Sequence, residues 1–491
     1  AAVKALNNCY TYLGNMDEQL YSEAMTDNAY TKQPNDFTQN IGNGSYSTAD
    51  SYVKQVWDGR YTGIRMCNQL LENIDRVPDL DPELKKRYIG EAKVLRAYNY
   101  YELYTKFGDV PYTTKVLSIK ESMSIARTDR ATVIANMLAD LDEVINGNYL
   151  PASYDADNKG RITRWAAMAI KAKIYLFEGN WTQVKNITST IMTEGGFRLF
   201  GSYAGLFEIA NEYNSEVILD AQYRPTSREH QMMYAFLPPS LGGYSQLSPL
   251  QELVDSYIML DGKTIRETGT SFDESNPYAN RDPRLKATVM YTGNSYTLAD
   301  GTEVVINCEK GEGKDGYGVG SDCSATGYYI KKYWDNTYRA TLYSGLNPIL
   351  IRYADILLMN AEALAELGEL DKTAWDATIK PIRDRAGFTL ASAVEFPEGA
   401  SKDKLIEIVR NERRSELALE GHRHKDIIRW RIADDVLNGW CHGLKTNEVV
   451  GTDNGYVRVE NRAFNANKHY LWPIPQAERD LNGNLVQNPN W

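Results

Sequence analysis

The sequence predicts a mainly α-helical protein in which a scaffold of stacked helix pairs is joined to a loop-rich part with short strands. Three observations support this prediction. Residues 347–387 read as a helix–turn–helix hairpin, residues 163–196 repeat that pattern, and residues 197–346 lose it. A hairpin of this size cannot bury its apolar face alone, so similar hairpins must stack beside it, as in tetratricopeptide-type repeats.

In residues 347–387, apolar side chains recur at three- and four-residue spacing, which places them on one face of a helix. They are Ile356, Met359, Ala363 and Leu367. Interspersed alanines favour the helix and let a neighbouring helix approach closely. Gly368 marks a turn, and Gly387 is placed as a C-terminal cap. We therefore expect two helices joined by one tight turn.

The second copy begins at Thr163, which is placed to cap an alanine-rich helix. Its turn falls at residues 179–181, and glycines at 195–196 end its second helix. Similar periodicity predicts further helices at residues 1–25, 51–76, 84–107 and 129–145, and from Ser401 onward. At least three repeat-like pairs result, two before residue 200 and one at 350–387.

Two segments, residues 26–50 and residues 197–346, break the helical pattern. Residues 26–50 are rich in Asn, Asp, Gln, Gly and Thr and are expected to form a long loop, a kind of segment that tends to be functional or mobile. We expect one unit with three parts: a helical scaffold (1–196), a loop-rich, ligand-facing insertion (197–346), and a final repeat, charged helix and C-terminal tail (347–491).

The composition of the chain disfavours several classes of partner and site. The net charge of −11 disfavours nucleic acid as a partner, and no apolar run reaches the roughly 18 residues that span a bilayer. The five cysteines form no zinc pattern, and their spacing leaves open whether Cys308 and Cys323 form a disulfide. Tyrosine outnumbers phenylalanine 34 to 11, which favours surfaces that are wet and able to stack on a ligand.

A dense set of opposite charges follows Ser401, in the run NERRSELALEGHRHKDIIRW at residues 411–430. Glutamates in this run are one helical turn apart, and planar arginine heads are expected to reach them. These residues are Glu412, Glu416 and Glu420, with Arg413, Arg423 and Arg429. We predict a partly buried ion network that locks this helix to the loop-rich part, rather than a solvated face. Losing one partner should cost about 3–5 kcal/mol.

This run resembles the signature of the SusD/RagB family of nutrient-binding surface lipoproteins of Bacteroidetes. Four other stretches resemble the same family in the same order, and together they cover essentially the whole chain: residues 160–163, 280–284, 352–363, and 472–475 leading to 487–489. The resemblance implies a scaffold of about four tetratricopeptide-like helix pairs beside a less regular half.

The resemblance also implies a function. A chain of this family binds an oligosaccharide without turnover, needs no cofactor, and passes the ligand to a SusC-like TonB-dependent transporter in the outer membrane. The family's lipid-bearing N-terminal cysteine is absent from this sequence, and Cys9 lies inside a helical pattern. Anchoring at the cell outer membrane is therefore implied by the resemblance alone.

Sugar recognition needs flat aromatic faces for the C–H faces of the rings, and planar polar groups for the hydroxyls. Two loops, 26–50 and 275–345, combine both. The matched family motifs are structural, so the predicted contacts come from loop composition. They are Asp27, Asn28, Tyr30, Tyr296, Trp334, Asp335 and Arg339.

Enzyme motifs fit poorly. Residues 201–205 misplace the serine of a nucleophile elbow, and residues 155–160 begin like a calcium loop but fail at Lys159 and Ala166, so no metal site is expected. Two alternatives stay open: a RagB-like peptide-uptake protein, and a glycoside hydrolase with two carboxylates about 5–10 Å apart across a cleft. The Tyr-, Trp- and Asn-rich loops favour a saccharide.

Overall fold

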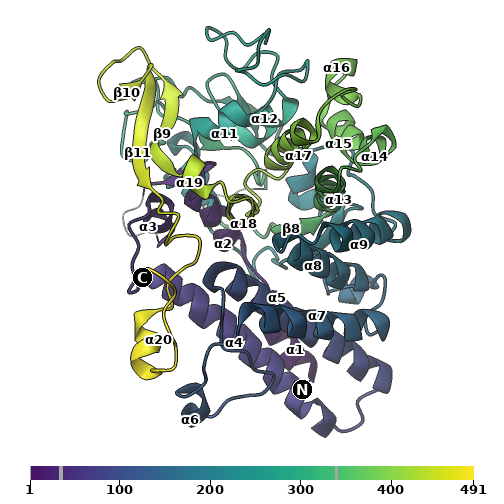
Figure 1. Cartoon of the computed structure of the whole chain (residues 1–491). Coiled ribbons are helices and arrows are strands. Elements are labelled where there is room, and N and C mark those ends of the chain that lie inside the picture. Colours follow the sequence, from purple (N-terminus) through teal and green to yellow (C-terminus); the bar gives the residue numbers. More distant parts are fainter. Residues whose placement is uncertain (1, 33–36, 338–340) are drawn as a thin grey trace.

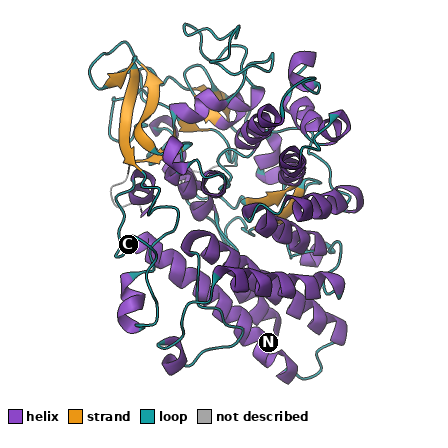
Figure 2. Cartoon of the chain, in the orientation of Figure 1, coloured by secondary structure: helices purple, strands orange, loops and turns teal. Residues whose placement is uncertain are grey.

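The computed structural model describes residues 2–32, 37–337 and 341–491. Helices dominate and the strands are short (Figure 2). The first part contains α1 (Ala2–Tyr10), α2 (Met16–Tyr21), β1 (Ala29–Thr31), α3 (Phe37–Asn43), α4 (Ser51–Asn73), α5 (Pro82–Phe107), α6 (Ile119–Ser122), α7 (Arg130–Asn146), α8 (Arg164–Phe177) and α9 (Trp181–Glu194).

The middle of the chain is less regular. It contains β2 (Val217–Asp220), α10 (Met232–Phe236), β3 (Leu247–Pro249), α11 (Gln251–Ser256), α12 (Pro283–Thr288), β4 (Val289–Met290), β5 (Ser295–Thr297), β6 (Glu303–Val305) and β7 (Tyr329–Ile330). The last part contains β8 (Ile349–Arg352), α13 (Tyr353–Leu367), α14 (Lys372–Ala377), α15 (Ile379–Ala386), α16 (Ala391–Val394), α17 (Lys402–Glu416), α18 (Arg423–Arg429), α19 (Ala433–Val436), β9 (Asn438–Lys445), β10 (Thr452–Asp453), β11 (Tyr456–Ala463) and α20 (Gln476–Leu481).

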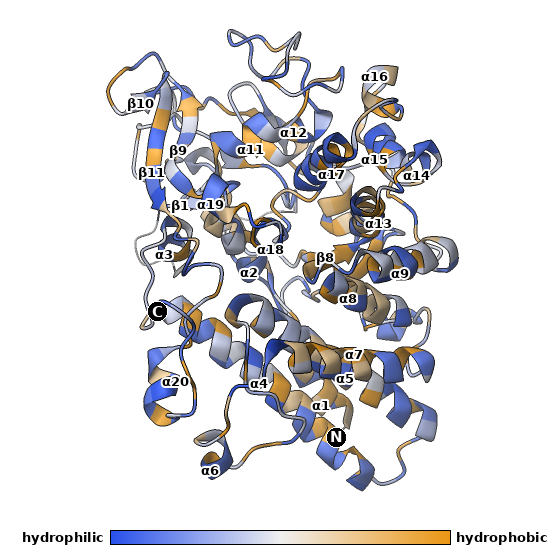
Figure 3. Cartoon of the chain, viewed as in Figure 1, coloured by the Kyte–Doolittle hydropathy of each residue, from blue (hydrophilic) through white to orange (hydrophobic). Residues whose placement is uncertain are grey.

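The scaffold is a continuous stack of helices. In the order α4, α5, α7, α8, α9, α13 and α17, each helix packs on the next (Figure 1). Their facing sides form the main hydrophobic core, and α8 and α13 are largely hydrophobic while α20 is hydrophilic (Figure 3). The predicted mainly α fold with a strand-containing part is confirmed.

The helix caps predicted at Thr163, Ser401, Gly368 and Gly387 are confirmed. The Thr163 hydroxyl accepts from the Ala166 N–H at the start of α8, and the Ser401 hydroxyl does the same for Lys404. Gly368 and Gly387 end their helices with φ of 73° and 103°, in the left-handed region that glycine adopts most readily.

The hairpin at 347–387 differs from the prediction because its second helix is split. α14 ends at Ala377 and α15 begins at Ile379, with Thr378 between them at φ −124° and ψ −71°. Pro381 explains the break: it has no N–H to donate to the Ala377 carbonyl, and its ring crowds that carbonyl. The stretch also begins with strand β8.

Three other segments differ from the prediction: two expected helices are broken by turns, and one expected loop contains a strand and a helix. The helix expected over 1–25 is divided at Asn15, whose side chain caps α2. The helix from Ser401 ends at Glu416, because Leu419 and Gly421 take positive φ before α18. The expected loop 26–50 holds β1 and α3, and β1 pairs antiparallel with the distant strand β3. Pairing across the fold overrides local composition there.

The insertion leaves and re-enters the scaffold at one place. β2 pairs antiparallel with β8, so the two ends of the intervening chain are hydrogen-bonded to each other. The insertion has its own hydrophobic core, to which α2 and α10 contribute. Cys308 and Cys323 are buried there as free thiols, so the disulfide left open by the sequence is not formed.

Candidate ligand-binding site

A pocket of about 560 Å³ lies where the α1–α2 turn, α2 and α4 meet the insertion. Three tyrosine rings line it: Tyr12 from the turn, Tyr21 from the end of α2, and Tyr52 from the first turn of α4. Planar polar groups lie between the rings, including the amide of Gln246 and the guanidinium of Arg60. The pocket therefore combines stacking surfaces with fixed hydrogen-bonding groups.

Arg60 is held rigidly in the pocket wall. It is 5 % exposed, forms an ion pair with Glu18, and donates to the Tyr12 carbonyl at 2.9 Å. Burial would lower the pKa of Arg60, but the carboxylates of Glu18 and Glu102 raise it above the ordinary value. The guanidinium is therefore charged at every physiological pH and fixed in orientation.

Other polar groups join the wall to the insertion. The Asn15 side chain accepts from the Glu18 N–H at 2.8 Å, which orients α2. The Tyr21 hydroxyl donates to the Gln246 amide oxygen at 3.0 Å, so this contact ties α2 to the insertion. The buried hydroxyl of Thr38 also lines the pocket and has no hydrogen-bond partner within the described parts of the chain. A bound hydroxyl group would satisfy it.

The sequence-predicted contacts Asp27 and Asn28 lie inside the protein. The Asp27 carboxylate accepts from Arg423 at 2.8 and 2.9 Å and pairs with Arg414 at 2.9 Å. Burial would raise the pKa of Asp27, but the two arginines hold it well below its usual range. Asn28 donates to Glu23 and accepts from Arg414. Both side chains therefore connect the N-terminal segment to α17 and α18.

Tyr296, Trp334 and Asp335 lie in the insertion. Tyr296 is fully buried and donates to the Ile330 carbonyl at 2.6 Å, with its ring 5.1 Å from the Trp334 ring. Trp334 is half-buried and donates to the Thr297 carbonyl. Asp335 is buried and accepts from the Ser344 hydroxyl. These groups mainly hold the insertion together.

Two predicted contacts remain. Tyr30 is half-buried on β1, and its hydroxyl oxygen accepts from the Gln39 amide at 3.3 Å. Arg339 lies outside the described residues. The 560 Å³ pocket thus uses tyrosines that loop composition did not select. The excess of tyrosine was the sequence signal, but it does not distinguish a core ring from a pocket ring.

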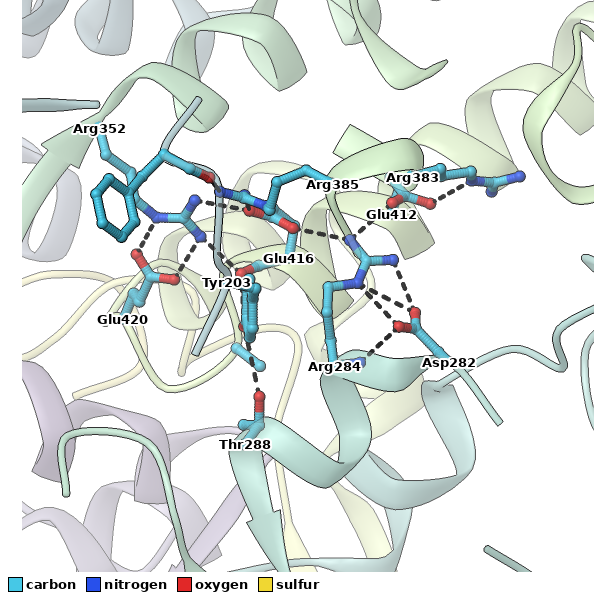
Figure 4. Close-up of polar contacts among 12 residues, drawn as sticks. Tyr203, Asp282, Arg284, Thr288, Arg352, Arg383, Arg385, Glu412, Glu416 and Glu420 are labelled. Atoms are coloured by element: carbon cyan, nitrogen blue, oxygen red, sulfur yellow. Dashed lines mark hydrogen bonds and ion pairs between the residues drawn. The ribbon is translucent and has the colours of Figure 1, made fainter. Parts of the chain in front are cut away.

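Charged residues of the run 411–430 build a buried network that lies outside the 560 Å³ pocket (Figure 4). Glu416 is bound by Arg284 at 2.9 Å, by Arg352 at 2.7 Å and by Arg385. Glu420 is bound by Arg352 and by Lys332, each at 2.7 Å. Arg284 and Lys332 belong to the insertion, so the predicted lock between the charged helix and the loop-rich part is confirmed.

The partners within this network differ from the prediction. Arg413 binds Asp355 and Asp426, Arg423 binds Asp27, and Arg429 binds Glu362 and Asp426. Neighbouring residues on a helix point about 100° apart, so a glutamate and the arginine after it face different elements. The end of α17 at Glu416 then turns the later arginines away from Glu412 and Glu416.

Comparison with known proteins identifies the family. Residues 206–491 match the model of the SusD family, which is more than half of the chain, and residues 3–176 match a model described as "Starch-binding associating with outer membrane". The chain belongs to the SusD family.

Solved and curated SusD-like proteins resemble the chain over nearly its whole length. A SusD-like carbohydrate-binding protein of Bacteroides fragilis is 28 % identical, with a TM-score of 0.87 over 99 % of this chain and 98 % of that one. A second SusD-like protein of the same species is 26 % identical, with a TM-score of 0.85 over 99 % and 96 %. A SusD-like protein of Formosa agariphila is 26 % identical over 89 % of this chain and 78 % of its own.

In this SusD-family chain, the motifs that carry the resemblance serve the fold. Arg284, Arg352 and Glu416 lie in the buried network and not in the 560 Å³ pocket. Among the described residues, no helix has the length and apolar character needed to cross a membrane.

Proposed function

We propose that this chain captures an oligosaccharide in the 560 Å³ pocket between α2, α4 and the insertion, and releases it unchanged. The observation that carries the proposal is the set of three tyrosine rings around the fixed guanidinium of Arg60 and the amide of Gln246. Rings of this kind cover the apolar faces of sugars, and planar polar groups bond their hydroxyls. The volume falls in the range of small-ligand sites.

The carboxylates of the pocket favour binding over hydrolysis. Asp17 and Glu18 are neighbours on α2, and Glu18 is paired with Arg60. A glycosidase places an acid and a second carboxylate on either side of the scissile bond. Two adjacent residues on one short helix do not provide that arrangement. The carbohydrate-binding relative of Bacteroides fragilis, with which this chain shares its fold along its length, also supports binding.

The further steps follow from the family. We propose that the bound glycan passes to a SusC-like TonB-dependent transporter, and that the chain is held at the cell outer membrane by a lipidated N-terminal cysteine. Tyr30 and Trp334 keep partly exposed rings, so they stay proposed contacts for a longer ligand. Asp27 lines a separate pocket of about 400 Å³ and stays a proposed contact, whereas Asn28, Tyr296 and Asp335 would contact a ligand only after leaving the partners they have in this structure.

A glycan array followed by calorimetry tests the proposal. In Tyr12→Ala, loss of one stacking ring should weaken binding of the best glycan about tenfold, because an aromatic contact contributes about 0.5–1.5 kcal/mol beyond its buried area. Tyr213→Ala is the matched control, since Tyr213 is 40 % exposed and lies outside the pocket.

The outcomes separate the alternatives. Equal affinity in Tyr12→Ala and the parent chain would remove this pocket as the site. Binding of peptides but of no glycan would support the RagB-like alternative. Shortened products after incubation with the bound glycan would show a hydrolase.

A further inference from the structure

A second, smaller cavity adjoins the proposed glycan pocket on its inner side. Its volume is about 100 Å³, and four residues line both cavities: Gly14, Asn15, Glu18 and Tyr52. This inner chamber is much smaller than the outer pocket, which suits a substituent of a sugar better than a second sugar ring.

Charged side chains line the inner chamber, and most of them are neutralised by a partner. Asp426 lies between Arg413 and Arg429. Lys173 pairs with Asp355, and Glu18 pairs with Arg60. In these groups every cation or carboxylate that faces the chamber already has an opposite charge.

Glu102 is different because its two cations share it as their one carboxylate partner among the described residues, whereas Arg413 also pairs with Asp355 and Arg429 with Glu362. Glu102 lies 2.6 Å from the Lys106 Nζ and 2.9 Å from the Lys425 Nζ. The side chains of Glu102 and Lys106 are 6 % and 8 % exposed, and that of Lys425 is 23 % exposed. This corner of the chamber therefore carries one surplus positive charge in a place with little water to screen it.

Burial and neighbouring charges both act on the pKa of Lys106. Burial lowers the pKa of Lys106 to about 8; Glu102 opposes this shift and the ammonium of Lys425 adds to it. His424 also lines the chamber, and burial lowers its pKa to about 3, so it is a neutral ring with one N–H to donate. An anion beside Lys106 and Lys425 would offset the surplus.

The chamber also contains an unused acceptor. Gln19 is 6 % exposed and lines the chamber; its amide nitrogen donates to the Tyr333 hydroxyl at 2.6 Å. Its amide oxygen has no hydrogen-bond partner within residues 2–32, 37–337 and 341–491. A hydroxyl group of the sugar beside its oxyanion substituent would satisfy this oxygen, because the oxyanion itself has no proton to donate.

We infer that the inner chamber takes the oxyanion substituent of a sugar held in the outer pocket, so that the ligand class is an acidic oligosaccharide carrying carboxylate or sulfate groups. The inference rests on the proposed function, because it assigns a substrate class to the same site. Lys106 and Lys425 are the specificity-determining residues. Asp17 is the carboxylate that opposes the anion, and it is solvent-exposed at the outer pocket, where water and salt screen it.

The test uses a panel of uronate-containing and sulfated oligosaccharides, each beside its carboxyl-reduced or desulfated counterpart, measured by calorimetry against the full chain. A charge-assisted hydrogen bond contributes about 1.5–3 kcal/mol, so the acidic member of a bound pair should bind at least about tenfold more tightly than the neutral one. The uronate and sulfate arms show which oxyanion is taken.

The variant Lys425→Met keeps the aliphatic stem and removes the charge. It should reduce the ratio of acidic to neutral affinity to about twofold or less. Lys372→Met is the matched control, because Lys372 is an exposed lysine paired with Asp376 on the surface, and it should change neither affinity. Thermal unfolding of each variant confirms that it is folded.

Two results would overturn the inference while leaving the proposed function intact: neutral members that bind as tightly as their acidic partners, or an acidic preference that persists in Lys425→Met. A chain that binds no glycan of either kind would instead overturn the proposed function.

Discussion

Replacing Arg352 should be among the most damaging single changes to this fold. Its guanidinium donates to Glu420 at 2.8 and 2.7 Å, to Glu216 at 2.7 Å, and to the carboxylate and carbonyl of Glu416 at 2.7 Å each. The side chain is 1 % exposed. In Arg352→Met the three carboxylates stay buried while their shared cation is removed.

The expected loss of stability depends on the ion pairs that each carboxylate keeps after the substitution. Removing one partner of a buried ion pair costs about 3–5 kcal/mol because a charge is left unpaired. Glu416 keeps Arg284 and Arg385, Glu216 keeps Arg385, and Glu420 keeps Lys332. These remaining pairs prevent a threefold loss, so we expect about 4 kcal/mol in total.

Urea unfolding and calorimetry measure this loss. The unfolding entropy of about 2.1 cal/mol/K per residue scales to about 1 kcal/mol/K for 491 residues, so the melting temperature should fall by about 4 °C if the chain unfolds as one unit. Lys372→Met is again the control, since exposed pairs contribute about 0–1 kcal/mol. A loss below about 1 kcal/mol in Arg352→Met would refute the view that this network locks the insertion to the scaffold.

Three further predictions concern other parts of the fold. Asp27→Ala should destabilise the chain by about 3–5 kcal/mol, because it leaves two buried arginines unpaired; lost glycan binding at unchanged stability would instead restore Asp27 as a ligand contact. Gly44→Ala should unfold at lower urea than Gly439→Ala, although both glycines have positive φ, because a Cβ at 44 would lie 2.1 Å from a carbonyl and a Cβ at 439 meets nothing within 4 Å; equal midpoints would contradict this. The protonated ring of His442 donates to the carboxylates of Glu252 and Asp453, which raise its folded pKa above 6.5. Its contribution to stability is therefore full below pH 6.5 and is lost as the pH rises through the folded pKa, and an NMR titration giving a value at or below 6.5 would be the contrary result.

Local features of the sequence predicted the scaffold well. Side-chain spacing and caps such as Thr163 act within a few residues, so the helices they define could be located before any tertiary contact was known. The break before α15 was also local, since Pro381 marks it, but the stronger helical periodicity around it hid the signal.

The site was much harder to predict because its parts meet only in the folded chain. Asp27 has the composition of a binding residue, but its partner Arg423 is 396 positions away and uses both carboxylate oxygens. Tyr12 lies in a segment that the sequence predicted to be helical and Tyr52 lies in α4, and a tyrosine in a helical pattern is as consistent with the core as with a pocket. Only the packing of the α1–α2 turn against α4 places those rings around one space.

The pairing of β2 with β8 has a consequence for how such a protein can change. The chain leaves the scaffold after β2 and returns to it through β8, and these two strands are hydrogen-bonded to each other. The scaffold helices therefore contact the same pair of strands regardless of the length of the segment 221–348. Doubling the length of a flexible loop costs only about 0.6 kcal/mol in closure entropy. A change in the length of an exposed loop within this segment should therefore cost little stability, provided that Arg284 and Lys332 keep their ion pairs with Glu416 and Glu420.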